Sequence, residues 1–203
     1  MLTYPDILTQ KKAVVFELDD VLFPKKDYLL QVYYLFANLL EYTETVPPAN
    51  DLTDFMKIAY EQHGEWGIFE RAAEVFCIDR KYKAQFDGLH RTALLPLKLL
   101  LYKPMLELMQ TLHQEGKQLL VLTEGDPAVQ LNKLRHVEWN GLDQFIKVYF
   151  ADELQQQTKP LTFLLETNRL EAADMLCVHA AGTRAPSGTL PIDCVSADRF
   201  WPL

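Results

Sequence analysis

Two carboxylates separated by one residue follow a short apolar stretch near the start of the chain. The stretch begins at Ala13, and the acids are Glu17 and Asp19. Residues at alternating positions of a strand point to the same side, so both carboxylates would face one side of a strand near its end. Such a pair binds a divalent cation, or acts as nucleophile and general acid. The structural alternative is that the acids only mark the change from strand to polar loop.

A histidine and an arginine near the other end of the chain are further candidates. His179 ends an apolar stretch, and one interpretation is a transition metal bound by His179 and Glu17. The interpretation that we favour is a neutral, hydrogen-bonded histidine, because no further metal ligand is identifiable. Arg184 lies in the loop-like segment 180–188. It either brings positive charge into a pocket or faces solvent, which is the usual place of a loop arginine.

The cysteines do not form a recognisable metal or redox motif. Cys77, Cys177 and Cys194 are odd in number and widely spaced. This usage fits a reducing cytoplasm, where we expect the protein to be. Cys177 and Cys194 fall in strand-like segments, in which a cysteine more often packs as a small apolar side chain than acts as a nucleophile.

Composition excludes some classes of partner. The 203 residues are 49% hydrophobic and 24% charged, which is ordinary for a globular protein. The net charge of -8 repels phosphate backbones, so we expect no nucleic-acid partner. No signal peptide is expected from the first residues, and no apolar segment is long enough to cross a membrane. The lysine pairs 11–12 and 25–26 are predicted to be solvated turns, and no protein partner is identifiable.

Strand-like and helical segments alternate through most of the chain. This alternation predicts an α/β fold, a three-layer Rossmann-like parallel sheet with ligands at the carboxyl ends of its strands. The predicted strands are 13–18, 118–123, 148–151, 175–179 and a weaker one at 192–195. The predicted helices between them are 105–114, 129–137 and 161–170.

The segment after the first strand breaks the alternation and contains only helical patterns. We predict an all-helical insertion, in which Asn50 or Asp51 caps the second helix. The predicted helices are 28–42, 52–63, 66–76 and 80–93. The aromatic residues Tyr28, Tyr33, Tyr34 and Phe36 are expected to form its core.

Three segments together resemble the ordered motifs of the haloacid dehalogenase (HAD) superfamily. Residues 14–23 are similar to the first motif, a hydrophobic strand followed by Asp-x-Asp-x-Thr or Val. Residues 122–126 resemble the second motif, a strand that ends in Ser or Thr. Residues 151–153, followed by Lys159 and Pro160, resemble the third, which supplies a lysine. The resemblance covers nearly the whole chain, and the helical insertion lies where this superfamily places its C1 cap.

The resemblance implies a role for each matching residue. In the superfamily the first aspartate attacks phosphorus, or carbon in the dehalogenases, and the second acts as acid and base. Carried over, Glu17 stands at the nucleophile position and Asp19 at the acid/base position. Thr123 matches the phosphate-binding hydroxyl, with Glu124 beside it, and Lys159 matches the lysine that balances charge on the nucleophile and the phosphate.

Two positions depart from the pattern of the superfamily. Glu17 replaces the nucleophilic Asp, and its extra methylene moves the carboxylate by ~1 Å, a displacement that costs on the order of 10²-fold in rate. Ala180 stands where the resemblance places a magnesium-binding Asp. Asp174 cannot replace that Asp, because it precedes its strand and would lie at the opposite end of the sheet.

We therefore predict a core built from residues 1–21 and 98–203 and a helical cap of residues 22–97. The first hypothesis is a diverged HAD-like protein, impaired in Mg²⁺-dependent phosphoryl transfer, that binds a small anionic ligand or acts through protein contacts. The second is a working phosphatase for a small phosphorylated metabolite, which attacks with Glu17. The third is a dehalogenase, which needs no Mg²⁺. No cofactor is expected under the first hypothesis, whereas Mg²⁺, bound by Glu17 and Asp19, is expected under the second.

The loss of a metal-binding acid leads to a further expectation about charge. Without the carboxylate at position 180, less negative charge needs to be offset. Lys159 is then predicted to pair directly with Glu17 or Asp19, because an ammonium a few ångströms from a carboxylate favours both charged forms. This arrangement would be a metal-free site. The structural alternative is that Lys159 faces solvent and the pocket holds only water.

Overall fold

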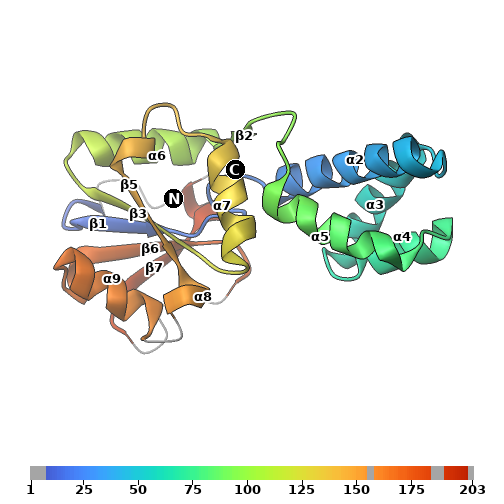
Figure 1. Ribbon diagram of the computed structural model, residues 1–203. Helices are drawn as coiled ribbons and strands as arrows, with labels where there is room; N and C mark the ends of the chain where they lie inside the picture. Colours follow the sequence, from blue (N-terminus) through green and yellow to red (C-terminus); the bar gives the residue numbers. More distant parts are fainter. Residues whose placement is uncertain (1–7, 155–157, 184–189, 201–203) are drawn as a thin grey trace. The chain divides into compact units, whose positions relative to one another are not determined.

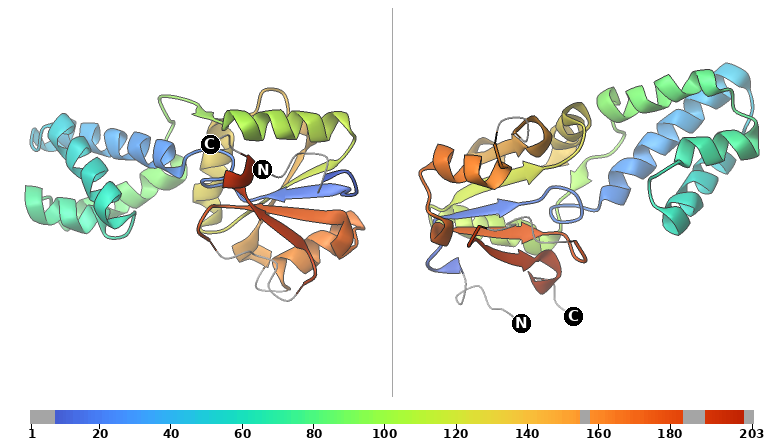
Figure 2. Two further views of the ribbon diagram at one scale, coloured as in Figure 1. Left: turned by 180° about the vertical axis from the view of Figure 1, so that it is seen from behind. Right: turned by 90° about the horizontal axis from the view of Figure 1, so that it is seen from below.

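The computed structural model describes residues 8–154, 158–183 and 190–200 (Figures 1 and 2). The chain divides into two compact units. The first comprises Met1–Lys25, Leu100–Gln130 and Val137–Leu203 and contains the large sheet. The second comprises Lys26–Leu99 and Leu131–His136 and is built of helices.

The first unit is organised around a five-stranded sheet with the strand order β5-β3-β1-β6-β7. Each neighbouring pair is parallel, which confirms the predicted fold class. In β1, Val15 is paired with Leu120 of β3 and Cys177 of β6. The strands are β1 (Ala13–Phe16), β3 (Gln118–Thr123), β5 (Ile146–Phe150), β6 (Met175–His179) and β7 (Asp193–Ser196).

Helices cover both faces of this sheet. Leu161 and Leu164 of α9 pack in one apolar cluster with Val15, Leu120 and Cys177. Figures 1 and 2 show α6 on the opposite face. The helices of this unit are α6 (Lys103–Gln114), α7 (Pro127–His136), α8 (Ala151–Leu154) and α9 (Pro160–Asn168), with short 3-10 turns at Asp143–Phe145, Ala172–Asp174 and Ala197–Phe200. The short strands β2 (Leu99–Leu100) and β4 (Val137–Glu138) form a separate two-stranded sheet.

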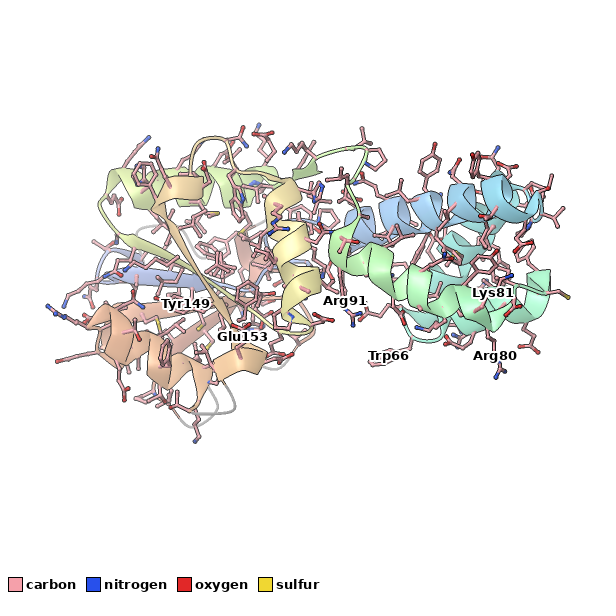
Figure 3. The ribbon with its side chains drawn as sticks, viewed as in Figure 1. Trp66, Arg80, Lys81, Arg91, Tyr149 and Glu153 are labelled. Atoms are coloured by element: carbon pink, nitrogen blue, oxygen red, sulfur yellow. The ribbon has the colours of Figure 1, made fainter. Side chains whose placement is uncertain are left out.

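The edge strand β5 is fixed to α9 by a polar cluster. Asn168 accepts a hydrogen bond from Lys147 at 2.9 Å and donates one to the hydroxyl of Tyr149, which Figure 3 labels, at 3.0 Å. Asn168 is buried, so these bonds satisfy polar atoms that water cannot reach. The predicted strand and helix are therefore joined by side chains that no hydrophobic pattern reveals.

The second unit is the predicted all-helical insertion. Tyr28, Tyr33 and Phe36 are fully buried in it, as expected, whereas Tyr34 is 47% exposed. Trp66, between the second and third helices, is 82% exposed (Figure 3). The helices are α2 (Lys25–Glu44), α3 (Ala49–His63), α4 (Ile68–Phe76) and α5 (Lys83–Thr92), with a 3-10 turn at Arg80–Tyr82. In the described part of the chain, no helix is long and apolar enough to cross a membrane.

The predicted cap of the second helix is wrong. The helix α3 begins at Ala49, and Pro48 takes the cap position without a side-chain hydrogen bond. The carbonyl of Pro48 accepts from the N–H of Leu52 at 3.1 Å. Proline is tolerated at the start of a helix because its missing N–H would have no partner there, so the helix starts earlier than the polar residues suggested.

The end of α7 belongs to the helical unit, although the sequence assigned it to the core. Asn132 donates to the carbonyl of Ala93 at 3.2 Å, and His136 accepts from the N–H of Leu95 at 3.0 Å. Lys133 is buried with its ammonium 5.2 Å from the ring centroid of Tyr28. These polar contacts between distant segments carry no periodic signal in the sequence.

Candidate functional site

A cavity of about 490 Å³ lies at the carboxyl ends of β1, β3 and β6. Ligands of open parallel sheets bind at this edge, because loops rather than strands continue there. The cavity is lined by residues from four segments, which are Val15 and Glu17–Asp20 with Lys25, Leu122–Glu124, Cys177–Val178, and Ala180 with Thr183. The ordered strands predict that Glu17, Thr123, Lys159 and Ala180 converge at this edge. Glu17, Thr123 and Ala180 do line the cavity, together with Asp19, whereas Lys159 does not.

Glu17 is held by the end of the neighbouring strand. The strand β1 ends at Phe16, two residues earlier than predicted. The backbone N–H of Glu17 donates to the carbonyl of Val178 at 3.0 Å, so pairing with β6 continues for one residue. The backbone N–H of Ala180 donates to the Glu17 carboxylate at 2.8 Å. The carboxylate is thereby bonded directly to the position where the resemblance places a metal-binding acid.

Burial raises the pKa of the Glu17 carboxyl group above its ordinary value. The hydrogen bond from Ala180 and the nearby His179 oppose this increase, because both stabilise the anion. Glu124 adds to the increase through charge repulsion. The net effect is that Glu17 holds a proton at a higher pH than an exposed glutamate does.

A tight loop after β1 positions the next acids and the first residue of α2. Asp20 has a positive φ of 59°, and its N–H donates to the carbonyl of Phe23 at 2.9 Å. Its side chain accepts from the N–H of Lys25 at 2.9 Å. Asp19, Asp20 and Lys25 all line the cavity. The predicted turn at residues 25–26 is therefore wrong, because Lys25 begins a helix and reaches the site.

The loop after β3 is fixed from two sides. The N–H of Gly125 donates to the carboxylate of Asp152 at 3.0 Å, and the side chain of Gln130 donates to the carbonyl of Glu124 at 2.7 Å. Gly125 has a φ of 102°, and a Cβ built there would lie 3.1 Å from the Gln130 amide nitrogen. Sequence reasoning missed Gln130 and the contact of Asp152. The only hint in the sequence is position: Gln130 lies at the start of the predicted helix 129–137, four residues after Asp126.

The end of β6 forms a small hydrogen-bonded turn. Nδ1 of His179 lies 3.0 Å from the carbonyl oxygen of Ala180, which only accepts, so Nδ1 carries a proton. The hydroxyl of Thr183 donates to the same oxygen at 2.8 Å. His179 is buried, as a hydrogen-bonded histidine should be. Thr183 lines the cavity and was not singled out from the sequence, and Arg184 lies outside the described residues.

Lys159 does not make the predicted contact. It is exposed, immediately before α9, and does not line the cavity. Among the described residues, no ion pair joins its ammonium to Glu17 or Asp19. The metal-free arrangement based on Lys159 is therefore corrected, and Lys25 is the lysine in the cavity.

The cavity lacks a carboxylate at the position where the resemblance places a magnesium ligand. Mg²⁺ takes near-octahedral oxygen ligands and usually one or two carboxylates. Ala180 offers none, and an oxygen of Glu17 is engaged by the Ala180 N–H. Within residues 8–154, 158–183 and 190–200, no three His, Cys, Asp or Glu side chains are arranged to hold a metal ion. Asp174 lies at the other end of the sheet, where its carbonyl accepts from Lys12 just before β1.

Sequence comparison alone finds no relatives, since no family model and no curated protein matches the chain. Solved structures do match. An HAD phosphatase from Thermococcus onnurineus aligns with a TM-score of 0.54 at 16% identity, over 91% of this chain and 85% of that one. A putative HAD-hydrolase from Bacillus subtilis, bound to magnesium, gives 0.53 at 16% identity, over 91% and 87%. A predicted phosphoglycolate phosphatase from Haemophilus somnus gives 0.51 at 19% identity, over 85% and 78%.

Identities this low establish the fold and not the activity. The first two matches cover 91% of this chain, which is more than either of its two compact units by itself. The protein therefore has the HAD-like, Rossmann-type α/β fold of these hydrolases and phosphatases.

Proposed function

We propose that the protein is a diverged HAD-like protein, impaired in Mg²⁺-dependent phosphoryl transfer. The observation that carries the proposal is the 2.8 Å hydrogen bond from the Ala180 N–H to the Glu17 carboxylate. It joins the position that the resemblance assigns to the nucleophile with the position it assigns to a metal ligand. Both the covalent and the metal contribution to phosphoryl transfer are then altered at once.

The environment of Glu17 supports the same proposal. Burial raises the pKa of its carboxyl group, so the fraction of the anion that can attack falls. The hydrogen bond to Ala180 further lowers the reactivity of the anion, because the bond must weaken as the oxygen becomes a nucleophile. A glutamate in this setting serves better as a structural acceptor than as an attacking group.

Charge limits the ligands of the cavity. The acidic residues Glu17, Asp19, Asp20 and Glu124 line it, and Lys25 is the one lysine or arginine among the described lining residues. We propose a small anion as ligand, bound by Lys25 and the hydroxyl of Thr123. Repulsion by the carboxylates makes such binding strongest at low pH, where Glu17 is protonated.

The competing function is a working phosphatase. It is favoured by one observation, that Glu17, Asp19 and Thr123 line the same cavity. In that case Glu17 would attack phosphorus to form an acyl phosphate, and Asp19 would protonate the leaving oxygen. The reaction would still need a cation to offset the charge of the phosphate, and position 180 offers no carboxylate to hold one.

Turnover distinguishes the two functions. Purified protein is assayed on a broad panel of phosphate monoesters, with Mg²⁺, with Mn²⁺ and without metal, beside the variant Glu17→Gln. We expect both proteins to hydrolyse every ester equally slowly. A rate on the order of 1–10³ per second that is lost in Glu17→Gln would establish the phosphatase instead.

A further inference from the structure

We propose that Lys25 is a built-in cation of the cavity, taking the place of a divalent metal ion. The inference rests on the proposed function, because it concerns the same cavity and explains how that cavity does without a metal. It assigns to Lys25 a task that the sequence had assigned to Lys159.

The charges of the lining show why a cation is needed. Glu17, Asp19, Asp20 and Glu124 line the cavity, and each is a carboxylate. Carboxylates that share a partly buried space repel one another, and the repulsion is reduced when a positive charge lies among them. Lys25 is the one lysine or arginine among the described lining residues.

Local structure fixes the backbone position of Lys25. Pro24 and the turn before it lead directly into α2, and the N–H of Lys25 is anchored to the side chain of Asp20 at 2.9 Å. The next lysine has a different partner, since Lys26 pairs with Glu61 of α3 at 2.5 Å. Two successive lysines thus have separate tasks, and Lys26 provides a matched control.

Lys159, the lysine that the resemblance places in the site, does not supply this positive charge. Lys159 is exposed and is absent from the lining. Lys25 is not among the main influences on the pKa of Glu17. These are burial, the hydrogen bond from Ala180, and the charges of His179, Glu124 and Cys194. The contact that ties Lys25 to the loop after β1 is the hydrogen bond from its backbone N–H to the Asp20 carboxylate, at 2.9 Å.

Removal of the lysine should leave more uncompensated negative charge in the lining, which attracts a free cation more strongly. We expect Lys25→Met to bind Mn²⁺ at least about tenfold more tightly than the wild type, which corresponds to about 1.4 kcal/mol. Titration calorimetry and the electron paramagnetic resonance signal of free Mn²⁺ measure the affinity without any turnover. Lys25→Arg keeps the charge and should behave as the wild type, as should Lys26→Met and Lys159→Met.

Three results would overturn the inference. They are an unchanged Mn²⁺ affinity in a folded Lys25→Met variant, an equal gain in Lys159→Met, or micromolar Mg²⁺ binding by the wild type. Circular dichroism and thermal melting check folding, and Lys25→Gln is a second neutral variant if Lys25→Met unfolds. Because no result depends on hydrolysis, the proposed function and this inference fail independently.

Discussion

Burial at the end of β1 makes the charged form of the Glu17 carboxyl group less stable. Its carboxyl group is partly buried and accepts a hydrogen bond from Ala180, and burial raises its pKa above the ordinary value of 4.5. A raised pKa in an acid means that the folded state binds a proton more tightly than the unfolded state. Stability from this group is complete below about pH 4.5 and is lost as the pH rises through the folded pKa.

Glu17→Gln should therefore stabilise the protein at neutral pH. The amide oxygen still accepts from the Ala180 N–H, whereas the cost of burying a charge disappears. We expect the melting temperature at pH 7 to rise by up to about 2–4 °C, the shift that about 1 kcal/mol produces in a chain of this size. Near pH 4 the two proteins should melt together.

Scanning calorimetry at several pH values measures this difference. Glu153→Gln, which neutralises an exposed carboxylate of α8 (Figure 3), is the control and should leave the pH profile as in the wild type. A Glu17→Gln variant less stable than the wild type at pH 7 would mean that the charged form is favoured by the site, contrary to the pKa direction.

At the scale of elements, the loop between β3 and α7 decides where Thr123 and Glu124 lie. Gln130 from the first turns of α7 and Asp152 from α8 hold this loop through one hydrogen bond each. Gly125 permits both, because its φ of 102° is strained for other residues and its missing Cβ leaves room for the Gln130 amide.

Gly125→Ala should destabilise the first unit by about 1–3 kcal/mol. The matched control is Gly116→Ala, since Gly116 also has a positive φ, of 73°, but no atom within 4 Å of its missing Cβ. The control should lose less stability, and the difference measures the contact with Gln130. Urea unfolding gives both values, and equal losses would show that the Gln130 contact relaxes without cost.

At the scale of the whole molecule, the parallel sheet assembles the cavity from segments more than 150 residues apart in sequence, such as Glu17 and Ala180. The inserted helical unit interrupts the chain between β1 and β3 without interrupting their pairing. Solved structures of hydrolases and phosphatases that share under a fifth of its residues have the same fold, with TM-scores of 0.51 to 0.54. The fold is therefore shared although most side chains differ.

Restoring the two side chains at positions 17 and 180 should restore part of the chemistry. We expect Glu17→Asp/Ala180→Asp to hydrolyse phosphate monoesters at least about tenfold faster than the wild type with Mg²⁺. Asp at position 180 supplies a carboxylate, and the shorter residue 17 reaches less far toward it. Adding Lys25→Met should increase the gain, because the built-in cation no longer competes with Mg²⁺.

Initial rates with Mg²⁺ and with EDTA test this expectation. Glu17→Asp/Ala180→Asn keeps the size of the new side chain without its charge and should show no gain. Equal rates in the Asp and Asn variants would indicate that the missing carboxylate at position 180 is not what limits the reaction.

The sequence by itself determined the order of strands and helices, the parallel sheet and the helical insertion. It did so because buried strands require continuous apolar residues and helices require apolar residues at helical spacing. Examples are the strand 118–123 and the helix predicted at 105–114, which is observed at Lys103–Gln114. It also placed Glu17, Thr123 and Ala180 at one edge, since carboxyl ends of parallel strands coincide. All of these are properties of short segments or of the fold class.

The tertiary structure alone decided which charged side chains reach the cavity. Lys25 lines it and Lys159 does not, although motif spacing suggested the reverse. Long side chains reach several ångströms from their backbone, and a loop such as 17–24 sets their direction through hydrogen bonds that leave no periodic pattern. The bond between Glu17 and the Ala180 N–H belongs to the same class, because a backbone donor has no signature in the sequence.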